Sequence, residues 1–542
     1  MRGKASLIIL IVAAFAIAGG SAVALRAMSG GGSTGDTARL VPADAAVYAT
    51  VNTDATSRQW VQLAQLLTRL GVGDDSRKAR DQGLLLAKLD WEKDIAPYLG
   101  GEATMALTSV DKAQPEGVVI LSVTDGDKAW QHATAKLDEL AKDGDGQPTD
   151  SSYRGVSIRT YPAGGSGTPL ALAHKGRYLI GGNSVDQVHA VLDLEAGKGD
   201  ALAGSKRFHD ARAAVNSDPL IFVYVNPSAL GSASSTFTSL AGMGTPSMGD
   251  ALRSAGFENA AFGFAFTAEA TGLRFEWQTV GINKANSAVT LREAPDQSRF
   301  ARRAPADTLV YVAGADIYDS YVKGVRQALD RYGKSDAGAQ AASAFDDGIN
   351  QLSQELGFEI EKGLLAHLTG EYAFAFGAPT PTPDAIWALG MTAVDSQAAM
   401  QPAITKIGAY LDKLGLSPTT RKVGGATVTT VESPDNPDQA VAYTLTGDEL
   451  LIAYGAQTLT DALAQSNSLA DNADYKEAEA LLPKGRALSA FVNLKRAVAL
   501  AKDSASNDPS VPWQALAHLR FLVASVTQAA DHAGGLVFVR ID

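Results

Sequence analysis

Residues 40–54, LVPADAAVYATVNTD, recur in altered form at residues 303–316 as RAPADTLVYVAGAD. The proline, alanine, aspartate, valine and tyrosine of the first stretch return in the same order, each 263 residues later. In each stretch a Pro-Ala-Asp turn leads into a run of residues with high strand propensity. A repeated unit organises the whole chain, so this match is interpreted before any other motif.

Further matches follow in the same order along the chain. LGGE at residues 99–102 corresponds to LTGE at residues 368–371, and Gly155 corresponds to Gly425. Near the end of each half, a Gly-Leu pair with a phenylalanine two residues later returns at the original spacing of 263 residues. Colinear matches at nearly constant spacing indicate two copies of one unit.

The repeat predicts the following organisation. Residues 1–27 form a signal anchor or transmembrane segment, and residues 28–37, which are rich in glycine and serine, form a flexible linker. The first copy occupies residues 38–282, the second occupies residues 300–542, and a polar connector at residues 283–299 joins them.

Within each copy the hydrophobic period changes repeatedly between that of a strand and that of a helix. The first strand is expected at residues 45–51, and a helix bearing Trp60 and Leu63 follows it. Thr56 and Ser57 are its candidate N-caps, with Gly71 at its C-terminal end and Leu67 and Leu70 on the same face. The second copy is expected to contain the equivalent helix. One face of it should carry Tyr318, Tyr321, Val325, Leu329 and Tyr332, and Gly333 follows its end.

The later part of the first copy predicts more strands than helices. Runs of neighbouring strands with single helices between them are typical of an antiparallel α+β architecture. The expected elements are strands at 118–123, 153–161, 169–174 and 177–181, a hairpin of 260–267 with 272–280, a helix bearing Trp130, Ala133, Leu137 and Leu140, and a helix at 184–194.

The N-terminal segment predicts export. Residues 5–25 carry no charge and follow Arg2 and Lys4. About 20 apolar residues cross a bilayer, and basic residues before a span favour a cytoplasmic N-terminus. We therefore expect an α+β tandem duplication preceded by one N-terminal transmembrane helix, a single-pass protein of the cell membrane with its body outside the cytoplasm. The alternative is secretion after cleavage near Ala22-Val23-Ala24.

The composition excludes several classes of partner. The chain has 542 residues, a net charge of -12 and no cysteine. Nucleic-acid binding requires a basic surface that neutralises phosphates. A chain with this acidic net charge is not expected to provide one, so no nucleic-acid partner is expected. Without cysteine there is no disulfide, thiolate metal site or lipidated cysteine.

Three short motifs match catalytic or nucleotide-binding patterns in unsuitable contexts. Residues 31–35 match G-x-S-x-G but lie in the linker and not between a strand and a helix. Ser109 and Lys112 have S-x-x-K spacing but follow a strand, which favours a turn. Residues 333–335, GKS, follow a helix and lack the earlier glycine of a P-loop, so no nucleotide is expected.

Histidines and recurring acids are the remaining candidates for chemistry. Asp44 and Asp307 recur between the copies, as do Glu102 and Glu371, and paired carboxylates serve acid-base catalysis or bind hard cations. A turn role for the aspartates and a strand-opening role for the glutamates are the preferred interpretations. We therefore predict no catalytic, metal or cofactor residues. The seven histidines show no paired-ligand spacing: His132, His174, His189, His209, His367, His518 and His532.

The N-terminal span, the linker and the repeated opening PADAAVYATVN and PADTLVYVAGAD resemble the bacterial envelope-associated family catalogued as domain of unknown function 3352. The resemblance covers nearly everything after the linker. It implies an envelope location and supplies no catalytic residues, because the family has no established activity.

Two functional hypotheses remain. The favoured one is a non-catalytic binding or structural module that is held at the membrane by its N-terminal helix and contacts an envelope protein, a polymer or a lipid. The alternative is an envelope hydrolase with an unrecognised active site. An apolar groove favours the binding module, whereas convergent titratable groups in a pocket favour the enzyme.

Overall fold

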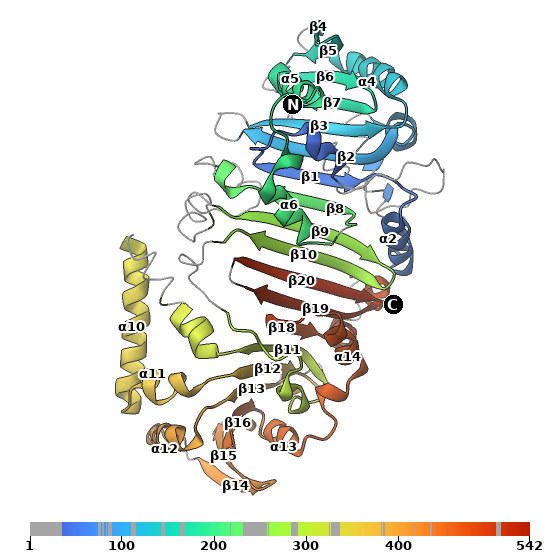
Figure 1. The fold of residues 1–542 in the computed structure, drawn as a ribbon. Helices are drawn as coiled ribbons and strands as arrows, with labels where there is room; N and C mark the ends of the chain where they lie inside the picture. The colour runs from blue at the N-terminus through green and yellow to red at the C-terminus, as the bar shows by residue number, and fades with distance from the viewer. Residues whose placement is uncertain are drawn as a thin grey trace. The chain divides into compact units, whose positions relative to one another are not determined.

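The protein comprises two compact units, Met1–Ala285 and Asn286–Asp542. They are seen in a computed structural model, which also gives the strands and helices of each unit (Figure 1). The residues that the structure describes are 35–73, 77–78, 81–82, 84, 89–109, 115–142, 147–162, 169–216, 218–230, 257, 259–282, 291–324, 326, 336–380, 382, 385–416, 418–433, 436–505, 511–529 and 531–542.

The strands of the first unit pair in the order β4-β5-β6-β7-β3-β2-β1-β8-β9-β10, and every pairing is antiparallel. Their bounds are β1 (Val47–Asn52), β2 (Leu99–Ser109), β3 (Glu116–Val123), β4 (Thr149–Tyr153), β5 (Val156–Tyr161), β6 (Leu170–Lys175), β7 (Tyr178–Gly182), β8 (Ile221–Val225), β9 (Ala261–Glu269) and β10 (Gly272–Val280).

The strands of the second unit pair in the order β14-β15-β16-β17-β13-β12-β11-β18-β19-β20, again antiparallel throughout. The two sheets therefore have the same strand order, with β11 in the place of β1 and β12 in the place of β2. Their bounds are β11 (Thr308–Ala315), β12 (Glu371–Gly377), β13 (Trp387–Ala393), β14 (Thr419–Val423), β15 (Ala426–Ser433), β16 (Asn436–Thr446), β17 (Glu449–Tyr454), β18 (Arg486–Val492), β19 (Leu519–Gln528) and β20 (His532–Ile541).

Helices and short helical turns connect these strands. Those of the first unit are η1 (Asp36–Leu40), α2 (Arg58–Arg69), η2 (Trp91–Ile95), α4 (Gly126–Ala141), α5 (Val185–Glu195), η3 (Leu202–Gly204), α6 (Lys206–Ala213) and η4 (Pro227–Ala229). Those of the second unit are η6 (Arg299–Arg302), η7 (Tyr318–Val322), α10 (Asp336–Leu356), α11 (Ile360–Gly363), η8 (Leu365–His367), α12 (Gln397–Lys413), α13 (Ala456–Ala464), η10 (Leu469–Asp471), α14 (Ala473–Ala480), α15 (Leu494–Ala505) and α16 (Trp513–Leu516).

Strand β6 shows how the first sheet is covered on both faces. Successive side chains of a strand point to opposite faces. Ala171 and Ala173 belong to the main core, together with residues of α5, whereas Leu170 and Leu172 lie on the other face and line a cavity with residues of α4. Helices α5 and α4 both lie beside β6 and β7 (Figure 1). The first sheet therefore has a sealed face and a face with a cavity.

Each core is built around a buried tyrosine on the strand that follows the Pro-Ala-Asp turn. Tyr48 meets Phe208 edge to face, with ring centroids 5.5 Å apart. Tyr311 meets Tyr475 in the same way at 5.7 Å. Such aromatic pairs add about 0.5–1.5 kcal/mol beyond the area they bury. The recurring tyrosines thus mark equivalent core positions.

Several predicted elements of the first unit are confirmed. Strand β1 overlaps the predicted strand, and the predicted helix begins after Ser57 and ends before Gly71, whose φ is 68°. The predicted hairpin is formed by β9 and β10. The predicted helices containing Trp130 and residues 184–194 are α4 and α5.

The single strand predicted at residues 153–161 is wrong. The chain instead makes a hairpin, in which Tyr153 of β4 pairs with Val156 of β5. The two residues between them, Arg154 and Gly155, have φ values of 51° and 75°. Positive φ at both central residues is the requirement of a type I′ turn, and an arginine at the first of these positions conceals that turn from sequence inspection.

The predicted fold class, an α+β tandem duplication preceded by a single N-terminal transmembrane helix, is wrong. The described residues form a fold dominated by antiparallel sheet, with twenty strands plus helices. Strands such as β4 and β8 escape the sequence analysis because they are short and, in β4, polar. Among the helices of the described residues, none combines the length and the apolarity needed to span a bilayer. The span predicted at residues 5–25 lies outside the described residues.

Candidate functional site: an apolar cavity beneath α4

The first unit contains a cavity of ≈ 170 Å³ between α4, η2 and the sheet. Its lining is mostly apolar, and leucine is the most frequent residue in it. The lining residues are Leu89, Asp94, Ile95, Tyr98, Leu99, Val119, Leu121, Val123, Ala129, His132, Ala133, Lys136, Leu137, Leu140, Leu170, Leu172, Leu179 and Gly181.

Helix α4 forms the roof of this cavity. It begins after Asp125, whose side chain accepts a hydrogen bond from the Lys128 backbone N–H at 3.1 Å and so caps the helix. Its apolar residues recur at helical spacing, but Ala129 alone of the described α4 residues is fully buried. Leu137 and Leu140 remain partly exposed. The apolar face of α4 is therefore held over the sheet without being sealed against it.

The floor consists of side chains from three adjacent strands. Leu121 of β3, Leu172 of β6 and Leu179 of β7 point to this face. Gly181 lies among them, and a Cβ atom there would contact the Leu170 and Leu172 side chains at 3.6 Å and 3.9 Å. The missing side chain at Gly181 leaves the floor open between these leucines.

The π-helical turn η2 forms one wall. Its first residue, Trp91, is 8% exposed and packs in a small cluster with Leu84 and Ala103. Asp90 caps η2 by accepting a hydrogen bond from the Lys93 backbone N–H at 3.1 Å. Because η2 is fixed by these contacts, Leu89 and Ile95 are held in the wall of the cavity.

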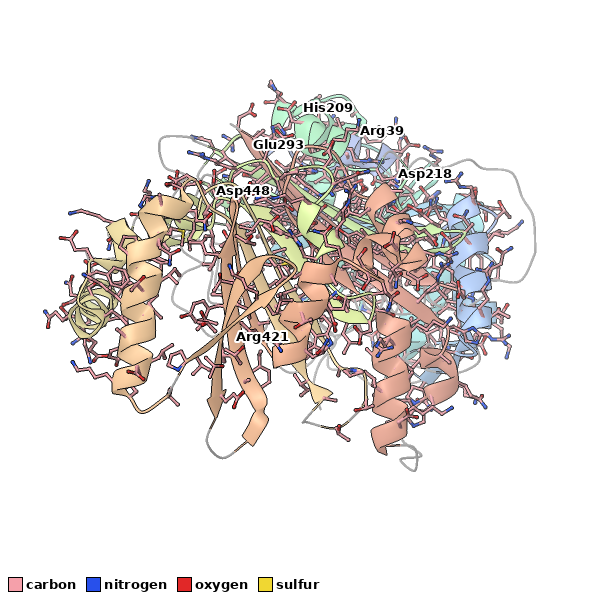
Figure 2. The ribbon with its side chains drawn as sticks, turned by 90° about the horizontal axis from the view of Figure 1, so that it is seen from below. Arg39, His209, Asp218, Glu293, Arg421 and Asp448 are labelled. Carbon is pink, nitrogen blue, oxygen red and sulfur yellow. The ribbon has the colours of Figure 1, made fainter. Side chains whose placement is uncertain are left out.

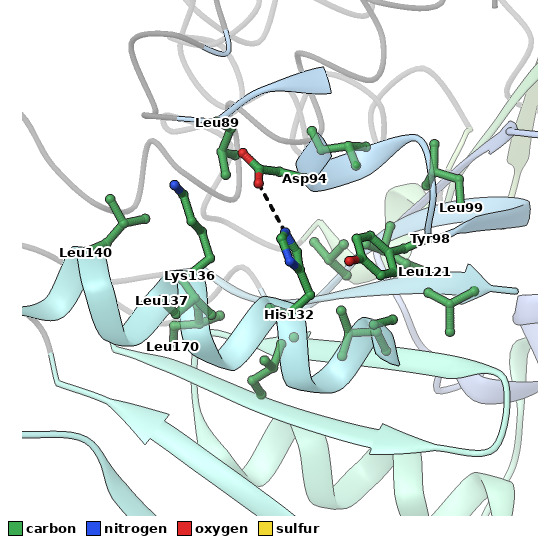
Figure 3. A pocket seen from close by; sticks show the side chains of 18 residues that line it. Leu89, Asp94, Tyr98, Leu99, Leu121, His132, Lys136, Leu137, Leu140 and Leu170 are labelled. Atoms are coloured by element: carbon green, nitrogen blue, oxygen red, sulfur yellow. Dashed lines mark hydrogen bonds and ion pairs between the residues drawn. The ribbon is translucent and has the colours of Figure 1, made fainter. Parts of the chain in front are cut away.

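The polar side chains of the lining gather on one side of the cavity. His132 Nε2 lies 3.1 Å from Asp94 Oδ1, and the imidazole stacks on the Tyr98 ring with centroids 4.7 Å apart. Figure 3 shows His132 and Lys136 rising from α4 toward Leu89 and Asp94, with Leu137 and Leu170 below Lys136. The cavity is therefore amphipathic, with an apolar body and a polar rim.

The cavity has the volume and the lining to accept a hydrocarbon group. An apolar cavity of about 150 Å³ in another protein stays dry and binds benzene, so a volume of this order accepts a hydrocarbon group. Among the described lining residues there is no serine, threonine or cysteine to act as a nucleophile. In the part of the chain that the structure describes, no cluster of three potential metal ligands occurs.

The same face of the second sheet is arranged differently. Gly390 of β13 pairs with Ile452 of β17 in the positions that Val119 and Gly181 occupy in the first sheet. The Ile452 side chain is 46% exposed and Phe374 on the neighbouring strand is 49% exposed. Ile452 is thus open to solvent, whereas its counterpart in the first unit, Gly181, lines a cavity.

The recurring glutamates lie elsewhere and have a structural role. Glu102 is 1% exposed, and its carboxylate accepts hydrogen bonds from the backbone N–H groups of Gly35 and Thr37 at 2.6 Å and 3.0 Å. It also accepts hydrogen bonds from the hydroxyls of Thr50 at 2.6 Å and Tyr48 at 3.3 Å. The Glu102 side chain, on β2, thus links the start of η1 to strand β1 through these hydrogen bonds.

Glu371 makes the equivalent connection in the second unit. Its carboxylate accepts hydrogen bonds from the Ser298 hydroxyl and from the Arg299 backbone N–H, the latter at 3.3 Å. The Arg299 guanidinium donates to Asp448, which Figure 2 labels, at 2.6 Å. The prediction that these glutamates only open a strand therefore misses their main contact, which is with the preceding helical turn.

A pH dependence of stability follows from the burial of Glu102. Burial raises the pKa of Glu102 above its ordinary value, so the folded state binds the proton more tightly than the unfolded state. The resulting stabilisation is present below the ordinary glutamate pKa, about 4.3, and is lost as the pH rises through the raised value. Glu102→Gln imitates the protonated carboxyl group and cannot ionise. The difference between the two free energies of unfolding, wild type minus variant, should therefore fall as the pH rises from about 4 to about 8. Denaturant titrations across this range measure the difference, and a constant difference would contradict the prediction.

The recurring aspartates are turn residues, as the sequence analysis preferred. Asp44 is exposed in a turn closed by a hydrogen bond from the Ala45 backbone N–H to the Pro42 carbonyl at 3.1 Å. Asp307 lies in the matching turn and is 3.6 Å from the Arg496 guanidinium. The aspartates are therefore not part of the cavity.

Most of the other candidates also lie away from the cavity. His189 stacks on Tyr153, and His367 lies 2.8 Å from Asp395. Residues 31–34 and 333–335 and Lys112 lie outside the described residues, and Ser109 ends β2. Of the seven histidines only His132 lines the cavity, whereas His174, His209, His518 and His532 do not.

Sequence analysis missed the polar rim, which consists of Asp94, Tyr98, His132 and Lys136. One signal was available: His132 and Lys136 are four residues apart on a helix, so they share a face. They adjoin the predicted apolar stripe that contains Ala133. The partnership of Asp94 with His132 joins residues 38 positions apart and depends on the fold.

The fold and the cavity together define a class: an antiparallel-sheet protein with helices on both faces and an amphipathic cavity beneath one of them. The chain belongs to the family described as "Protein of unknown function (DUF3352)", whose model matches residues 4–528. The family resemblance stated from the repeated opening is therefore confirmed.

Two solved structures are similar to part of the chain. They are titled "Structure of crystal form IV of TP0453" and "Structure of crystal form III of TP0453", and each is 11% identical with a TM-score of 0.24. The first match covers 45% of this chain and 79% of the other, and the second covers 44% and 78%. Comparison with curated proteins gives no match.

Proposed function

We propose that the protein is a non-catalytic binding protein whose first unit holds a single aliphatic chain in the cavity beneath α4. The observation that carries this proposal is the leucine-rich lining on both roof and floor, with only four polar side chains, Asp94, Tyr98, His132 and Lys136, among the described lining residues. Of the partner classes expected from the sequence, a lipid fits this cavity better than a protein or a polymer, because only a thin apolar chain enters such a volume.

Burial energetics support an apolar ligand. Each methylene removed from water contributes about 0.8 kcal/mol. The partly exposed side chains of Ala133, Leu137 and Leu140 line the cavity, and a chain placed there would remove them from water as well. A ligand therefore completes packing that the protein alone leaves incomplete.

The alternative function, a hydrolase, has weaker support. The Asp94 and His132 pair could orient an imidazole as a general base. A base needs a nucleophile or a positioned water, and the described lining supplies no serine, threonine or cysteine for the imidazole to activate. Binding without catalysis is therefore preferred.

The binding proposal is tested on the full-length protein by calorimetric titration with dodecanol below its solubility limit. We expect a saturable heat with one molecule bound per chain. A linear, non-saturating signal would count against a defined site and against the proposed function.

We further propose that the protein works outside the cytoplasm, in the cell envelope, with the membrane as its partner through the N-terminal segment. The support is the sequence order of basic residues, the apolar run at 5–25 and the Gly/Ser-rich stretch. Protease added to intact spheroplasts should digest the body, whereas a cytoplasmic reporter protein should survive. Protection of the body would refute export. Mass spectrometry of the mature N-terminus separates retention of the segment from cleavage and secretion.

A further inference from the structure

Within the part of the chain that the structure describes, the rim lysine, Lys136, pairs with a solvent-exposed carboxylate. Lys136 Nζ lies 3.3 Å from Glu139 Oε2. The Lys136 side chain is 24% exposed, whereas that of Glu139 is 66% exposed. Exposed ion pairs of this kind contribute little, so Glu139 is easily replaced by a better-placed anion.

The acidic residue of the rim is already engaged on both oxygens. Asp94 Oδ2 accepts a hydrogen bond from the Asp90 backbone N–H at 2.7 Å, and Oδ1 lies 3.1 Å from His132 Nε2. The Asp94 side chain is only 12% exposed. A ligand cation would have to share oxygens that already have partners, whereas a ligand anion would meet the Lys136 ammonium group.

The position of Lys136 relative to the leucines fixes the orientation of a ligand. Leu137 and Leu140 follow it on α4 and line the same cavity. Figure 3 shows the Lys136 ammonium group at the upper end of its side chain, with Leu137 and Leu170 below it. A chain lying among the leucines would therefore place its head group beside the ammonium.

Resting on the proposed function, we propose that the natural ligand is a single-chain amphiphile with an anionic head group, and that Lys136 selects it. A charge-assisted hydrogen bond from an ammonium group to a carboxylate or phosphate is about twice as strong as a neutral one. A fatty-acid carboxylate and a phosphate monoester share this chemistry.

The test compares dodecanoate, dodecyl phosphate, dodecanol and dodecylammonium in titrations into the full-length protein, with dodecanol kept below its solubility limit and the charged ligands below their micelle concentrations. We expect dodecanoate to bind roughly tenfold more tightly than dodecanol, and dodecylammonium to bind more weakly than dodecanol. Lys136→Met keeps the aliphatic stem and should abolish the preference for the anion, so that dodecanoate no longer binds more tightly than dodecanol. Lys142→Met, at an exposed position on the end of the same helix and outside the cavity lining, is the matched control and should keep the preference.

The outcomes separate the two proposals. Equal binding of dodecanoate and dodecanol, or a preference that survives Lys136→Met, overturns the role of Lys136 and leaves the apolar cavity intact as a site. Failure of dodecanol itself to bind overturns the proposed function. Where anion selectivity is found, tighter binding of dodecanoate than of dodecyl phosphate assigns a fatty acid, and the reverse assigns a phosphorylated lipid.

Discussion

Glu102→Ala is expected to lower the free energy of unfolding of the first unit by about 3 to 5 kcal/mol, which is among the larger effects of single substitutions. The substitution leaves the buried backbone N–H of Thr37 and the partly buried backbone N–H of Gly35 without their acceptor. It also removes the nearer acceptor of the Thr50 hydroxyl, which keeps the Ala103 carbonyl at 3.3 Å. Each unsatisfied buried donor costs about 1–3 kcal/mol, and relief of the buried carboxylate offsets part of that cost.

Urea denaturation of the full-length protein, followed by circular dichroism and tryptophan fluorescence, measures this effect. Glu139→Ala is the matched control, because that side chain is 66% exposed, and its effect should stay within about 0.5 kcal/mol. Should the two compact units unfold in separate transitions, the one that moves is assigned by its fluorescence change. A loss of less than about 1 kcal/mol would show that the Glu102 contacts do not hold η1 to the sheet.

Ala133→Trp is expected to weaken dodecanol binding roughly hundredfold. Ala133 lies in the cavity roof, and an indole ring there occupies a volume of the order that accepts benzene. Excluding about four methylenes from the cavity removes about 3 kcal/mol of binding free energy, which corresponds to roughly two powers of ten.

The control for this substitution lies two residues further along α4. Ala135 is exposed, so Ala135→Trp adds the same ring outside the cavity and should leave binding unchanged. Circular dichroism of both variants checks that α4 and the sheet still form. Unchanged dodecanol affinity in a folded Ala133→Trp protein would place the ligand elsewhere.

The helical stripe of α4 illustrates how far the sequence predicts the site. The spacing of Ala133, Leu137 and Leu140 correctly predicts an amphipathic helix. The same spacing predicts a sealed core, whereas these three side chains line a cavity. Periodicity reports which face of a helix is apolar, but the distance of that face from the sheet depends on packing by other segments, such as η2.

The recurring glutamates show a different limit of prediction from the sequence. The recurrence of Glu102 as Glu371 correctly drew attention to two equivalent positions, and the preference for a structural role agrees with their buried contacts. Their partners could not be predicted, because Thr37 and Glu102 are 65 positions apart and meet only through the pairing of β1 with β2. Local sequence specifies the strands, whereas long-range pairing specifies which polar groups they bury.

The central claim, that an aliphatic chain binds beneath α4, is tested most directly by photolabelling. A dodecanol analogue with a diazirine near the end of its chain is irradiated with the full-length protein, and the labelled residues are located by mass spectrometry. The account predicts labelling of peptides that contain α4, β6 or β7, in competition with unlabelled dodecanol. Labelling confined to other peptides, or labelling that dodecanol does not suppress, would contradict it.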